Sequence, residues 1–413
     1  MNRRPFVAAA LFVIPFLVYL EDFHYAGSGD TQPAELLPVA VLQDGNFDFR
    51  RFFRPGEPLP YAFQERGGKV ISIYPILPGL LNVPTYAAAA AFGIDIEAER
   101  IRLSMISSAL ISALSVFFLF LALDRLVARR STAVLLAVTY AFGTCAWSVA
   151  SRGMFQHGPS LLMQSLALWM LARGDSRSVA GGGFFLGLAV VGRPTNLLLA
   201  IPLAVAVYRK HRESFAAFCV LGGIPFALRS IYARAYWGSA LSLAQADPFP
   251  AVSHFGGNPF RGLAGLLVSP SRGLFVYSPI FLFVGLAVGP AVRLRREKPI
   301  YLALLVGALA ILLATSSWTI WWGGHSFGYR LLIEMLPALT VLLALAWDEA
   351  IAGRRVRTAA FVFFLCGSVF LQAFGARYQP TGFNQKLDQD PGALWSLRES
   401  DVARAIRQCF RIA

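Results

Sequence analysis

Long apolar segments recur along this chain from about Leu11 to Phe374, and only short polar breaks separate them. The composition shows the same pattern, because 56% of the residues are hydrophobic and only 15% are charged. Such a profile is typical of a helical membrane protein with many spans. The predicted fold class is therefore an all-α polytopic integral membrane protein.

The net charge of +14 raises the question of a nucleic-acid partner. The Arg and Lys residues fall mainly in small clusters between apolar segments, however, and such clusters are retained on the cytoplasmic side of a membrane. We therefore expect membrane lipid as a partner and no nucleic acid. The sequence also contains neither G-x-x-x-x-G-K-[ST] nor G-x-G-x-x-G, so a nucleotide-driven pump and a Rossmann-type nucleotide-sugar enzyme lack support.

The basic clusters give each apolar segment a direction. Asn2-Arg3-Arg4 places the N-terminus in the cytoplasm, so the first span delivers Asp30 to the outer face. The later cytoplasmic clusters are Arg125, Arg129 and Arg130; Arg173 and Arg177; Arg209, Lys210 and Arg212; Arg293, Arg295, Arg296 and Lys298; and Arg354, Arg355 and Arg357.

Two spans fit between successive clusters, which predicts about eleven spans, each of around 20 apolar residues when untilted. The predicted spans are Phe6–Leu20, Leu103–Leu123, Ala133–Val149, His157–Leu171, Val179–Val191, Thr195–Val207, Phe215–Tyr236, Leu274–Val292, Ile300–Ser316, Leu331–Trp347 and Ala359–Phe374. The basic, apolar start also resembles a signal peptide, but it lacks an A-x-A-like cleavage site, which favours a retained first span. The four cysteines show no metal-site or disulfide spacing.

The segment YPILPGLLNVPTYAAAAAFG, residues 74–93, is apolar but carries three prolines. Counting it as a span would invert every later basic cluster, so we place it as a helix in the outer interface. The outer face then holds a long first loop (21–102), loops around 237–273 and 318–330, and a polar tail (376–413) that follows the membrane module (1–375). The polar groups gather there, which predicts that the protein acts on the outer side.

Asp30 and Glu35 lie where the chain first leaves the membrane, after the flexible turn Gly27-Ser28-Gly29. One interpretation is that Asp30 caps a short interfacial helix. Another is that a partly desolvated carboxylate acts as a general base or, together with Glu35, binds a divalent cation such as Mg²⁺ or Mn²⁺. The two interpretations are compatible.

This arrangement resembles the GT-C superfamily of polyprenyl-phosphate-dependent glycosyltransferases, in particular the protein mannosyltransferase and aminoarabinose transferase group. In that group an acidic loop motif is followed by a Lys-Pro-Pro-Leu-like helix; Asp30 matches the catalytic Asp, and YPILPGLL, which begins at Tyr74, matches the proline helix. The group's Asp-Glu pair is here Asp30-Thr31, with Glu35 as the next acid, and Lys69 is the Lys nearest to the prolines. The resemblance implies a GT-C-like helical bundle with Asp30 as catalytic base.

Several arginines lie at outer boundaries, against the positive-inside trend, and an Arg in that position needs an anionic partner. A lipid phosphate would supply one through bidentate hydrogen bonds, whereas each single Arg is also explained by snorkelling to lipid headgroups. The predicted donor-phosphate residues are Lys69, Arg152, Arg193, Arg272 and Arg330.

The predicted substrate-binding residues, on the outer side, are Tyr74, His157, Trp322, His325 and Tyr329. His157 is also explained as an interhelical hydrogen bonder, and the tryptophans around Trp322 as an interfacial belt. In the enzyme interpretation, Asp30 activates an acceptor hydroxyl of a glycan, lipid or protein, which displaces a polyprenyl phosphate from the donor sugar with inversion. The alternatives are a transporter or flippase of lipid-linked sugars, which often shows inverted repeats, and a non-catalytic assembly subunit. The short cytoplasmic loops suit a bacterial inner membrane.

Overall fold

The computed structural model describes residues 4–21, 25–240, 255–324, 326–378 and 390–410. Helices occupy the predicted spans, and several end within a few residues of the expected positions. The regular ones are α1 (Arg4–Leu20), α4 (Arg100–Leu126), α5 (Arg130–Phe142), α6 (His157–Arg173), α7 (Ser176–Gly192), α8 (Leu197–Lys210), α9 (Phe215–Trp237), α14 (Pro299–Ser316), α15 (Leu336–Ala346) and α16 (Arg355–Arg377).

Several predicted spans are not continuous α-helices. In the predicted span Ala133–Val149, α5 ends at Phe142 and a π-helix follows at Ala146–Ala150. Two others are divided as well. The first is divided into α12 (Leu274–Tyr277), a 3-10 helix (Pro279–Ala287) and α13 (Val288–Arg293). Pro279 lacks a backbone N–H and disfavours helical geometry in the residue before it, which accounts for the break there. The second begins with a 3-10 turn (Arg330–Met335) before α15.

Within the described part of the chain, five helices are long and apolar enough to cross a membrane. They are Arg100–Leu126, Arg212–Trp237, Pro299–Ser316, Arg330–Ile351 and Arg355–Arg377. Several of the remaining apolar helices are shorter than a bilayer requires of an untilted helix. The structure therefore confirms a mainly helical, membrane-type architecture, while the count of eleven spans stays a prediction.

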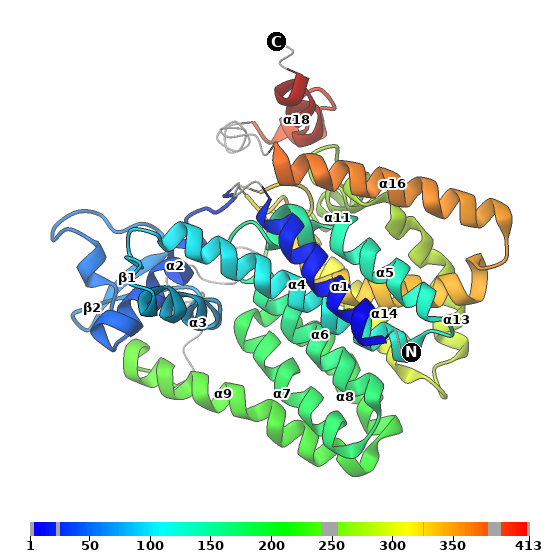
Figure 1. Cartoon of the computed structure of the whole chain (residues 1–413), viewed down its shortest axis with the longest axis horizontal. Helices are drawn as coiled ribbons and strands as arrows, with labels where there is room; N and C mark the ends of the chain where they lie inside the picture. Colours follow the sequence, from blue (N-terminus) through cyan, green and yellow to red (C-terminus); the bar gives the residue numbers. More distant parts are fainter. Residues whose placement is uncertain (1–3, 22–24, 241–254, 325, 379–389, 411–413) are drawn as a thin grey trace.

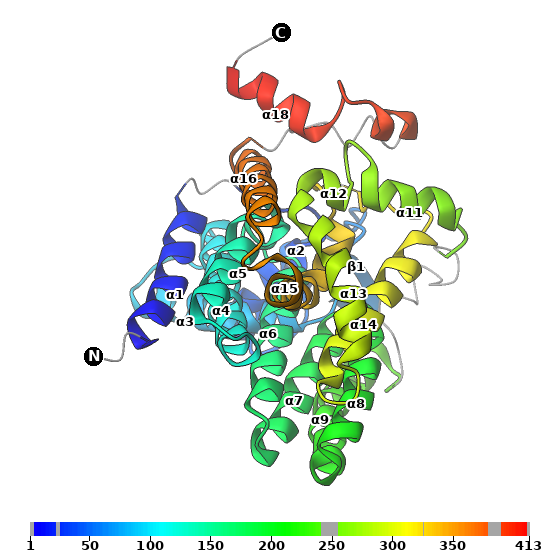
Figure 2. The ribbon, with the colours of Figure 1, turned by 90° about the vertical axis from the view of Figure 1, so that its right-hand side faces the viewer.

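The bundle packs around α15, all of whose residues are buried. Figure 2 shows α15 near the centre, with α4, α5, α6, α13 and α14 around it. Helices α7 and α9 pack closely because glycine has no side chain at their contact. A Cβ atom on Gly183 of α7 would lie 2.1 Å from the carbonyl oxygen of Phe218 on α9. A Cβ atom on Gly187 of α7 would lie 2.3 Å from the carbonyl oxygen of Gly222 on α9. Small residues spaced by four are a typical contact between membrane helices.

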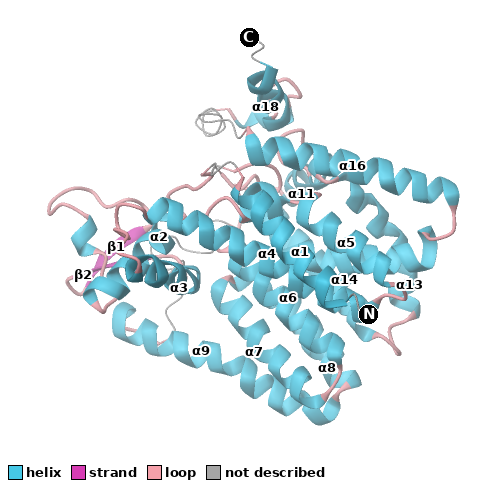
Figure 3. Ribbon diagram, viewed as in Figure 1, coloured by secondary structure: helices cyan, strands magenta, loops and turns pink. Residues whose placement is uncertain are grey.

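The first outer loop forms a compact unit at one end of the bundle (Figure 1). It contains α2 (Gln32–Val39), a hairpin of β1 (Phe63–Arg66) and β2 (Lys69–Ser72), and α3 (Leu77–Ala91). The hairpin pairs Phe63 with Ser72 and Arg66 with Lys69, and among the described residues it adds two short strands that the all-α prediction did not include (Figure 3). Gly67 and Gly68, both at positive φ, provide the tight turn that the apolar spacing alone does not reveal.

The basic turns meet at the opposite end of the bundle. The backbone N–H of Ala128, between α4 and α5, donates to Oδ2 of Asp348 (3.1 Å), and Arg293 of α13 pairs with the neighbouring Glu349. Helix α1 also begins at this end, at Arg4 (Figure 1). The described structure thus separates the basic turns from the first loop, as the charge pattern predicts.

Two further helices lie near the C-terminal tail. Helix α11 (Pro259–Val268) lies in the predicted outer loop 237–273, and α18 (Asp401–Phe410) forms from the amphipathic end of the tail. A 3-10 turn (Pro391–Trp395) precedes α18. Figure 2 shows α18 beyond the end of α16, on the outside of the bundle.

Candidate functional site

Asp30 lies at the centre of a cluster drawn from distant parts of the chain. Its Oδ1 accepts hydrogen bonds from the hydroxyls of Tyr61 (2.6 Å) and Tyr74 (2.7 Å), and its Oδ2 forms an ion pair with Arg330. Tyr61 precedes the hairpin, Tyr74 follows it, and Arg330 opens the segment that leads into α15. The first loop therefore folds so that both tyrosines and the carboxylate face the bundle.

The glycine just before Asp30 is required because the ring of Tyr61 leaves no room for a side chain there. A Cβ atom on Gly29 would lie 2.5 Å from Cε1 of Tyr61, so a larger residue would displace this ring. The capping interpretation of Asp30, by contrast, is wrong. Helix α2 has Thr31 as its N-cap with no side-chain cap hydrogen bond, and the Asp30 carboxylate is bound by side chains remote in sequence.

The surroundings of Asp30 favour its ionised form. Burial by itself would raise the pKa of Asp30, but the charge of Arg330 and the hydrogen bonds from Tyr61 and Tyr74 outweigh burial and hold the pKa well below its usual range. Burial and the adjacent carboxylate raise the pKa values of both tyrosines, so their hydroxyls remain protonated donors. As it stands, the cluster is a carboxylate surrounded by donors.

Arg330 is held by more than its ion pair. Its guanidinium lies over the ring of Phe155, 4.9 Å from the ring centroid. The segment before α6 also touches the first loop, because the backbone N–H of Ala26 donates to the carbonyl oxygen of Arg152 (3.0 Å). The side chain of Arg152 is 2% exposed in this region.

Glu35 lies apart from the Asp30 cluster. Its carboxylate accepts a hydrogen bond from Tyr25, whose hydroxyl also lies 2.8 Å from Oγ1 of Thr31. Burial raises the pKa of Glu35, and the hydrogen bonds from Tyr25 and Thr31 offset this only in part. The two acids that the sequence placed together thus have different partners and opposite pKa shifts.

A second charged cluster lies one helical turn beyond Arg330. Oε1 of Glu334 is 2.7 Å from Nδ1 of His157 and 2.8 Å from Nε of Arg193. Glu334 and His157 are fully buried, whereas Arg193 is 16% exposed. The second carboxylate oxygen of Glu334, Oε2, is also buried and accepts no hydrogen bond from the residues that the structure describes.

Glu334 was missed in the reading of the sequence because it lies within the apolar run of a predicted span. Its position was nevertheless a signal, because placing an acidic side chain inside a membrane span costs free energy unless the acid is paired or functional. Glu334 is thus a common partner of His157 and Arg193, and it brings both residues next to the turn that begins at Arg330.

Three other predicted residues have partners away from Asp30. Arg272 pairs with Asp401 of α18 and donates from Nε to the carbonyl oxygen of Trp322 (3.0 Å). The hydroxyl of Tyr329 is buried, 2.6 Å from Oγ of Ser278. Nζ of Lys69 lies 4.5 Å from the ring centroid of Tyr236.

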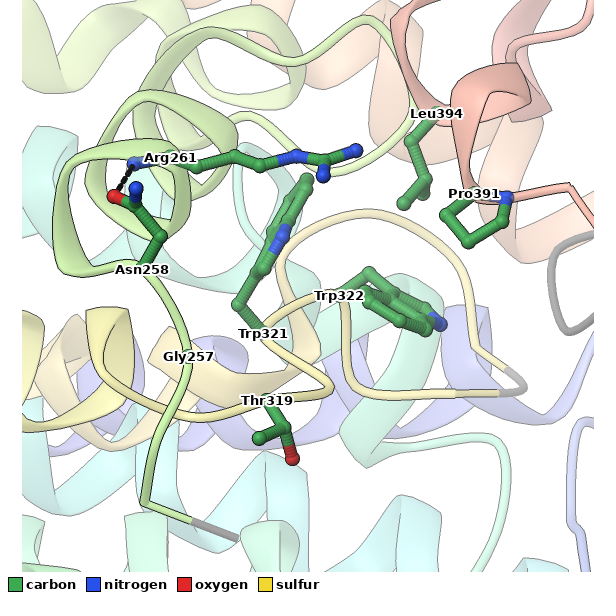
Figure 4. Close-up of a pocket in the computed structure, with 8 residues that line it drawn as sticks. All are labelled: Gly257, Asn258, Arg261, Thr319, Trp321, Trp322, Pro391 and Leu394. Atoms are coloured by element: carbon green, nitrogen blue, oxygen red, sulfur yellow. Dashed lines mark hydrogen bonds between the residues drawn. The ribbon is translucent and has the colours of Figure 1, made fainter.

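The two remaining predicted substrate-binding residues are Trp322 and His325. Trp322 lines a pocket of 230 Å³ between α11 and the tail (Figure 4). His325 lies outside the described residues. The structure therefore joins Asp30, Tyr74 and Arg330 in one cluster, and His157 with Arg193 in a second cluster.

The two acids proposed as cation ligands are engaged by protein donors in the described structure. Both oxygens of Asp30 face donors, one of them cationic, and Glu35 is engaged by Tyr25. Among the described residues, no group of three or more His, Cys, Asp or Glu side chains forms a potential metal site. Because Mg²⁺ often binds through one or two carboxylates, waters and substrate phosphates, a divalent cation stays a prediction from the sequence.

No family model and no characterised protein matches the sequence. Solved structures match in fold. ArnT from Cupriavidus metallidurans bound to undecaprenyl phosphate has 15% identity and a TM-score of 0.54, over 98% of this chain and 75% of that one.

Two structures of an oligosaccharyltransferase from Archaeoglobus fulgidus also match, each with a TM-score of 0.57. The apo form has 14% identity over 95% of this chain and 60% of that one. The complex of AglB with an inhibitory peptide and a dolichol-phosphate has 13% identity over 97% and 61%. This chain thus spans about three fifths of the archaeal enzyme's length. At these identities the likeness shows the fold alone: this chain shares the fold of the ArnT and AglB structures, which agrees with the fold that the sequence resemblance implies.

Proposed function

We propose that the chain is a membrane glycosyltransferase that moves a sugar from a polyprenyl-phosphate donor to an acceptor hydroxyl, with inversion. The observation that carries the proposal is the pairing of Asp30 with Arg330 in a GT-C-type fold, at the end of the bundle away from the basic turns. A general base and a cation for a phosphate are the two groups that this reaction requires. The solved structures with bound undecaprenyl phosphate and dolichol-phosphate share this fold and support the class of donor.

In the proposed reaction, Asp30 takes the proton of the acceptor hydroxyl as the hydroxyl oxygen attacks the anomeric carbon. The bond between that carbon and the phosphate oxygen breaks, and its electron pair leaves with the polyprenyl phosphate. Arg330, helped by Arg193 of the Glu334 cluster, stabilises the charge on the departing phosphate. Lys69, Arg152 and Arg272 are the further phosphate-binding residues proposed from the sequence, and His157, Trp322, His325 and Tyr329 those for the substrates.

Arg330 takes part both in setting the base strength of Asp30 and in binding the donor phosphate. While it is paired with Asp30, the depressed pKa makes the carboxylate a weak base. A donor phosphate competes for the same guanidinium and, once bound, draws it from Asp30. The pKa of Asp30 then rises, so that the base becomes stronger when the donor is in place. Tyr61 and Tyr74 keep the carboxylate in position during this exchange.

The chain would lie in a bacterial inner membrane with its N-terminus in the cytoplasm and the Asp30 cluster outside. The acceptor would be a glycan, a lipid or a protein. This orientation follows from the separation of the basic turns from the first loop, because basic residues are retained in the cytoplasm.

The test is sugar transfer by the purified protein in liposomes, with a panel of undecaprenyl-phosphate monosaccharides, each carrying a radiolabelled sugar, and membrane extract as acceptor. Asp30→Asn should lower the transfer rate by at least about 100-fold, because general-base catalysis contributes roughly 10² to 10⁴. Asp44→Asn is the matched control, since Asp44 is an exposed, ion-paired acid of the same loop. Transfer by Asp30→Asn at the wild-type rate would refute the proposal.

The same assay separates an enzyme from a carrier. A transporter or flippase would move the labelled donor between leaflets without breaking the bond between sugar and phosphate. The enzyme proposal requires release of free undecaprenyl phosphate in step with labelled acceptor. Movement of intact donor with no such release would favour the carrier.

A further inference from the structure

A small pocket on the C-terminal side of the molecule lies apart from the Asp30 cluster, and of its lining residues only Trp322 was proposed above for substrate binding. It has a volume of 230 Å³ and lies between the start of α11, the turn after α14 and the 3-10 turn of the tail. Its walls include Asn258 and Arg261 from α11, Trp321 and Trp322 from the turn, and Leu394 from the tail (Figure 4).

The aromatic wall of this pocket is formed by two indoles that pack against each other. The rings of Trp321 and Trp322 meet at 87° with centroids 5.9 Å apart. Trp321 is 5% exposed and packs on α11, where a Cβ atom at Gly265 would lie 2.3 Å from its ring. A glycine at 265 thus allows the indole to lie directly on the helix backbone. An indole face suits a sugar ring, whose axial C–H groups stack on aromatic surface.

Arg261 and Asn258 provide the polar side of the pocket. Figure 4 shows the guanidinium of Arg261 extending over the edge of Trp321. Arg261 is exposed, and its guanidinium has no hydrogen-bond or ion-pair partner among the described residues. Oδ1 of Asn258 accepts from the backbone N–H groups of Phe260 and Arg261, which leaves the Nδ2 amide as a donor.

The lining contains one charged side chain and no acid, so its chemistry favours an anion. Aromatic faces combined with an amide and a guanidinium suit a sugar ring that carries a carboxylate or phosphate group. The volume is below the roughly 300–1,000 Å³ of pockets for drug-sized ligands, which limits the occupant to about one ring.

The pocket is connected to the proposed catalytic cluster through the chain. Residues 318–330 carry Trp321 and Trp322 near one end and Arg330 at the other. An extended stretch from Trp322 to Arg330 spans at most about 28 Å. Arg272 ties this stretch to the tail, because it binds the carbonyl oxygens of Trp322 and Gly324 and pairs with Asp401. An occupant of the pocket would lie within a few sugar units of Asp30.

We propose that this pocket binds one anionic sugar residue of the acceptor, with its ring on the two indoles and its acidic group on Arg261. The assignment to the acceptor rests on the proposed function, whereas binding of the sugar itself does not. The residue bound here is a recognition element, and the transfer takes place at another position of the acceptor.

The test is saturation-transfer NMR on the full-length protein in detergent, with D-glucuronate as the probe and D-glucose as its uncharged match. Wild-type protein should bind glucuronate more tightly than glucose. Arg261→Gln should weaken glucuronate binding by about tenfold or more, since a charge-assisted bond is lost. Trp322→Leu should weaken the binding of both sugars.

Two matched controls distinguish a local effect from a general one. Arg295→Gln changes an exposed arginine at the basic end, and Trp169→Leu changes a half-buried tryptophan of α6, so neither should alter glucuronate binding. Thermal unfolding of each variant shows whether it is folded. Equal glucuronate binding by wild type and Arg261→Gln, or no binding by wild type, would overturn the proposal.

The outcomes also separate the pocket from the catalytic proposal. Asp30→Asn protein should bind glucuronate as the wild type does, whether or not the protein transfers sugar. Transfer by Asp30→Asn at the wild-type rate, with glucuronate binding intact, would refute the proposed glycosyltransferase mechanism and leave the sugar pocket unaffected. Transfer to acceptor with an unchanged KM in Arg261→Gln would refute the acceptor role of the pocket.

Discussion

Asp30 and Arg330 lie 300 residues apart in the chain and form an ion pair between the first long loop and the segment that enters the central helix α15. Their side chains are 16% and 12% exposed, so the pair is largely shielded yet reachable from outside. This ion pair thus fixes the first loop on the bundle. It also places the Asp30 carboxylate beside a guanidinium that can bind a phosphate instead. The predictions below depend on this dual role.

The Asp30 pair should make stability depend on pH in a defined window. The folded-state pKa of Asp30 lies below its ordinary value of 3.8, so its contribution to the free energy of unfolding is present above pH 3.8 and is lost as the pH falls through the lowered pKa. We expect Asp30→Asn to unfold at a lower temperature than wild type at pH 7 and at pH 5 alike. The difference should shrink only below about pH 4. A difference that disappears between pH 7 and pH 5 would contradict the lowered pKa.

Glu334 should contribute strongly to stability. Glu334→Gln removes the charge that both His157 and Arg193 contact, at a buried site, and breaking a buried pair costs about 3–5 kcal/mol. The matched control is Glu349→Gln, which breaks an exposed pair with Arg293 and should cost no more than about 1 kcal/mol. Thermal or denaturant unfolding of both variants measures the difference. An equal loss of unfolding free energy in the two variants would show that the buried cluster contributes no more to stability than the exposed ion pair does.

The Arg272 pair should hold the C-terminal helix. Arg272 and Asp401 are 1% and 3% exposed, and Asp401→Asn leaves the guanidinium without its counter-charge. We expect α18 to detach more often, so that limited trypsin digestion cleaves the tail at least about tenfold faster. Asp390→Asn, which alters an exposed capping acid just before the 3-10 turn, should leave the rate close to that of wild type. Unchanged cleavage in Asp401→Asn would assign the anchoring to other contacts.

Chelation should have little effect on sugar transfer. The oxygens of Asp30 are occupied by a guanidinium and two hydroxyl donors, and Glu35 has its own tyrosine partner. We expect the transfer rate in EDTA to stay within about twofold of the rate without it. Inhibition by EDTA that Mg²⁺ or Mn²⁺ reverses would show that a cation completes the site when the substrates are bound.

Helix positions could be predicted because the apolar pattern reports directly on them. The predicted segment Ile300–Ser316 corresponds to α14 at Pro299–Ser316, and Phe215–Tyr236 to α9 at Phe215–Trp237. The hairpin of the first loop could not be predicted in this way. Its strands are four residues each, too short for a clear alternation, and Gly67-Gly68 was its only distinct signal.

The candidate site was predictable only in part for a related reason. Asp30 and Arg330 were found because each charge stands out at a membrane boundary, but the sequence does not show which charge pairs with which. Arg272 has the same signature as Arg330, yet its partner is Asp401 in the tail. Pairing depends on how the helices pack, and this information appears only once the bundle is formed.

The most direct test of the shared arginine is the affinity of undecaprenyl phosphate for three forms of the protein in detergent. In the wild type the lipid phosphate must displace Asp30 from Arg330. Asp30→Asn removes this competitor, so the variant should bind undecaprenyl phosphate roughly tenfold more tightly while it transfers sugar at least about 100-fold more slowly. Arg330→Gln should bind it more weakly by a similar factor, and Asp44→Asn should bind it as the wild type does. Equal or weaker binding by Asp30→Asn would contradict the account, because the carboxylate and the phosphate would then not compete for Arg330.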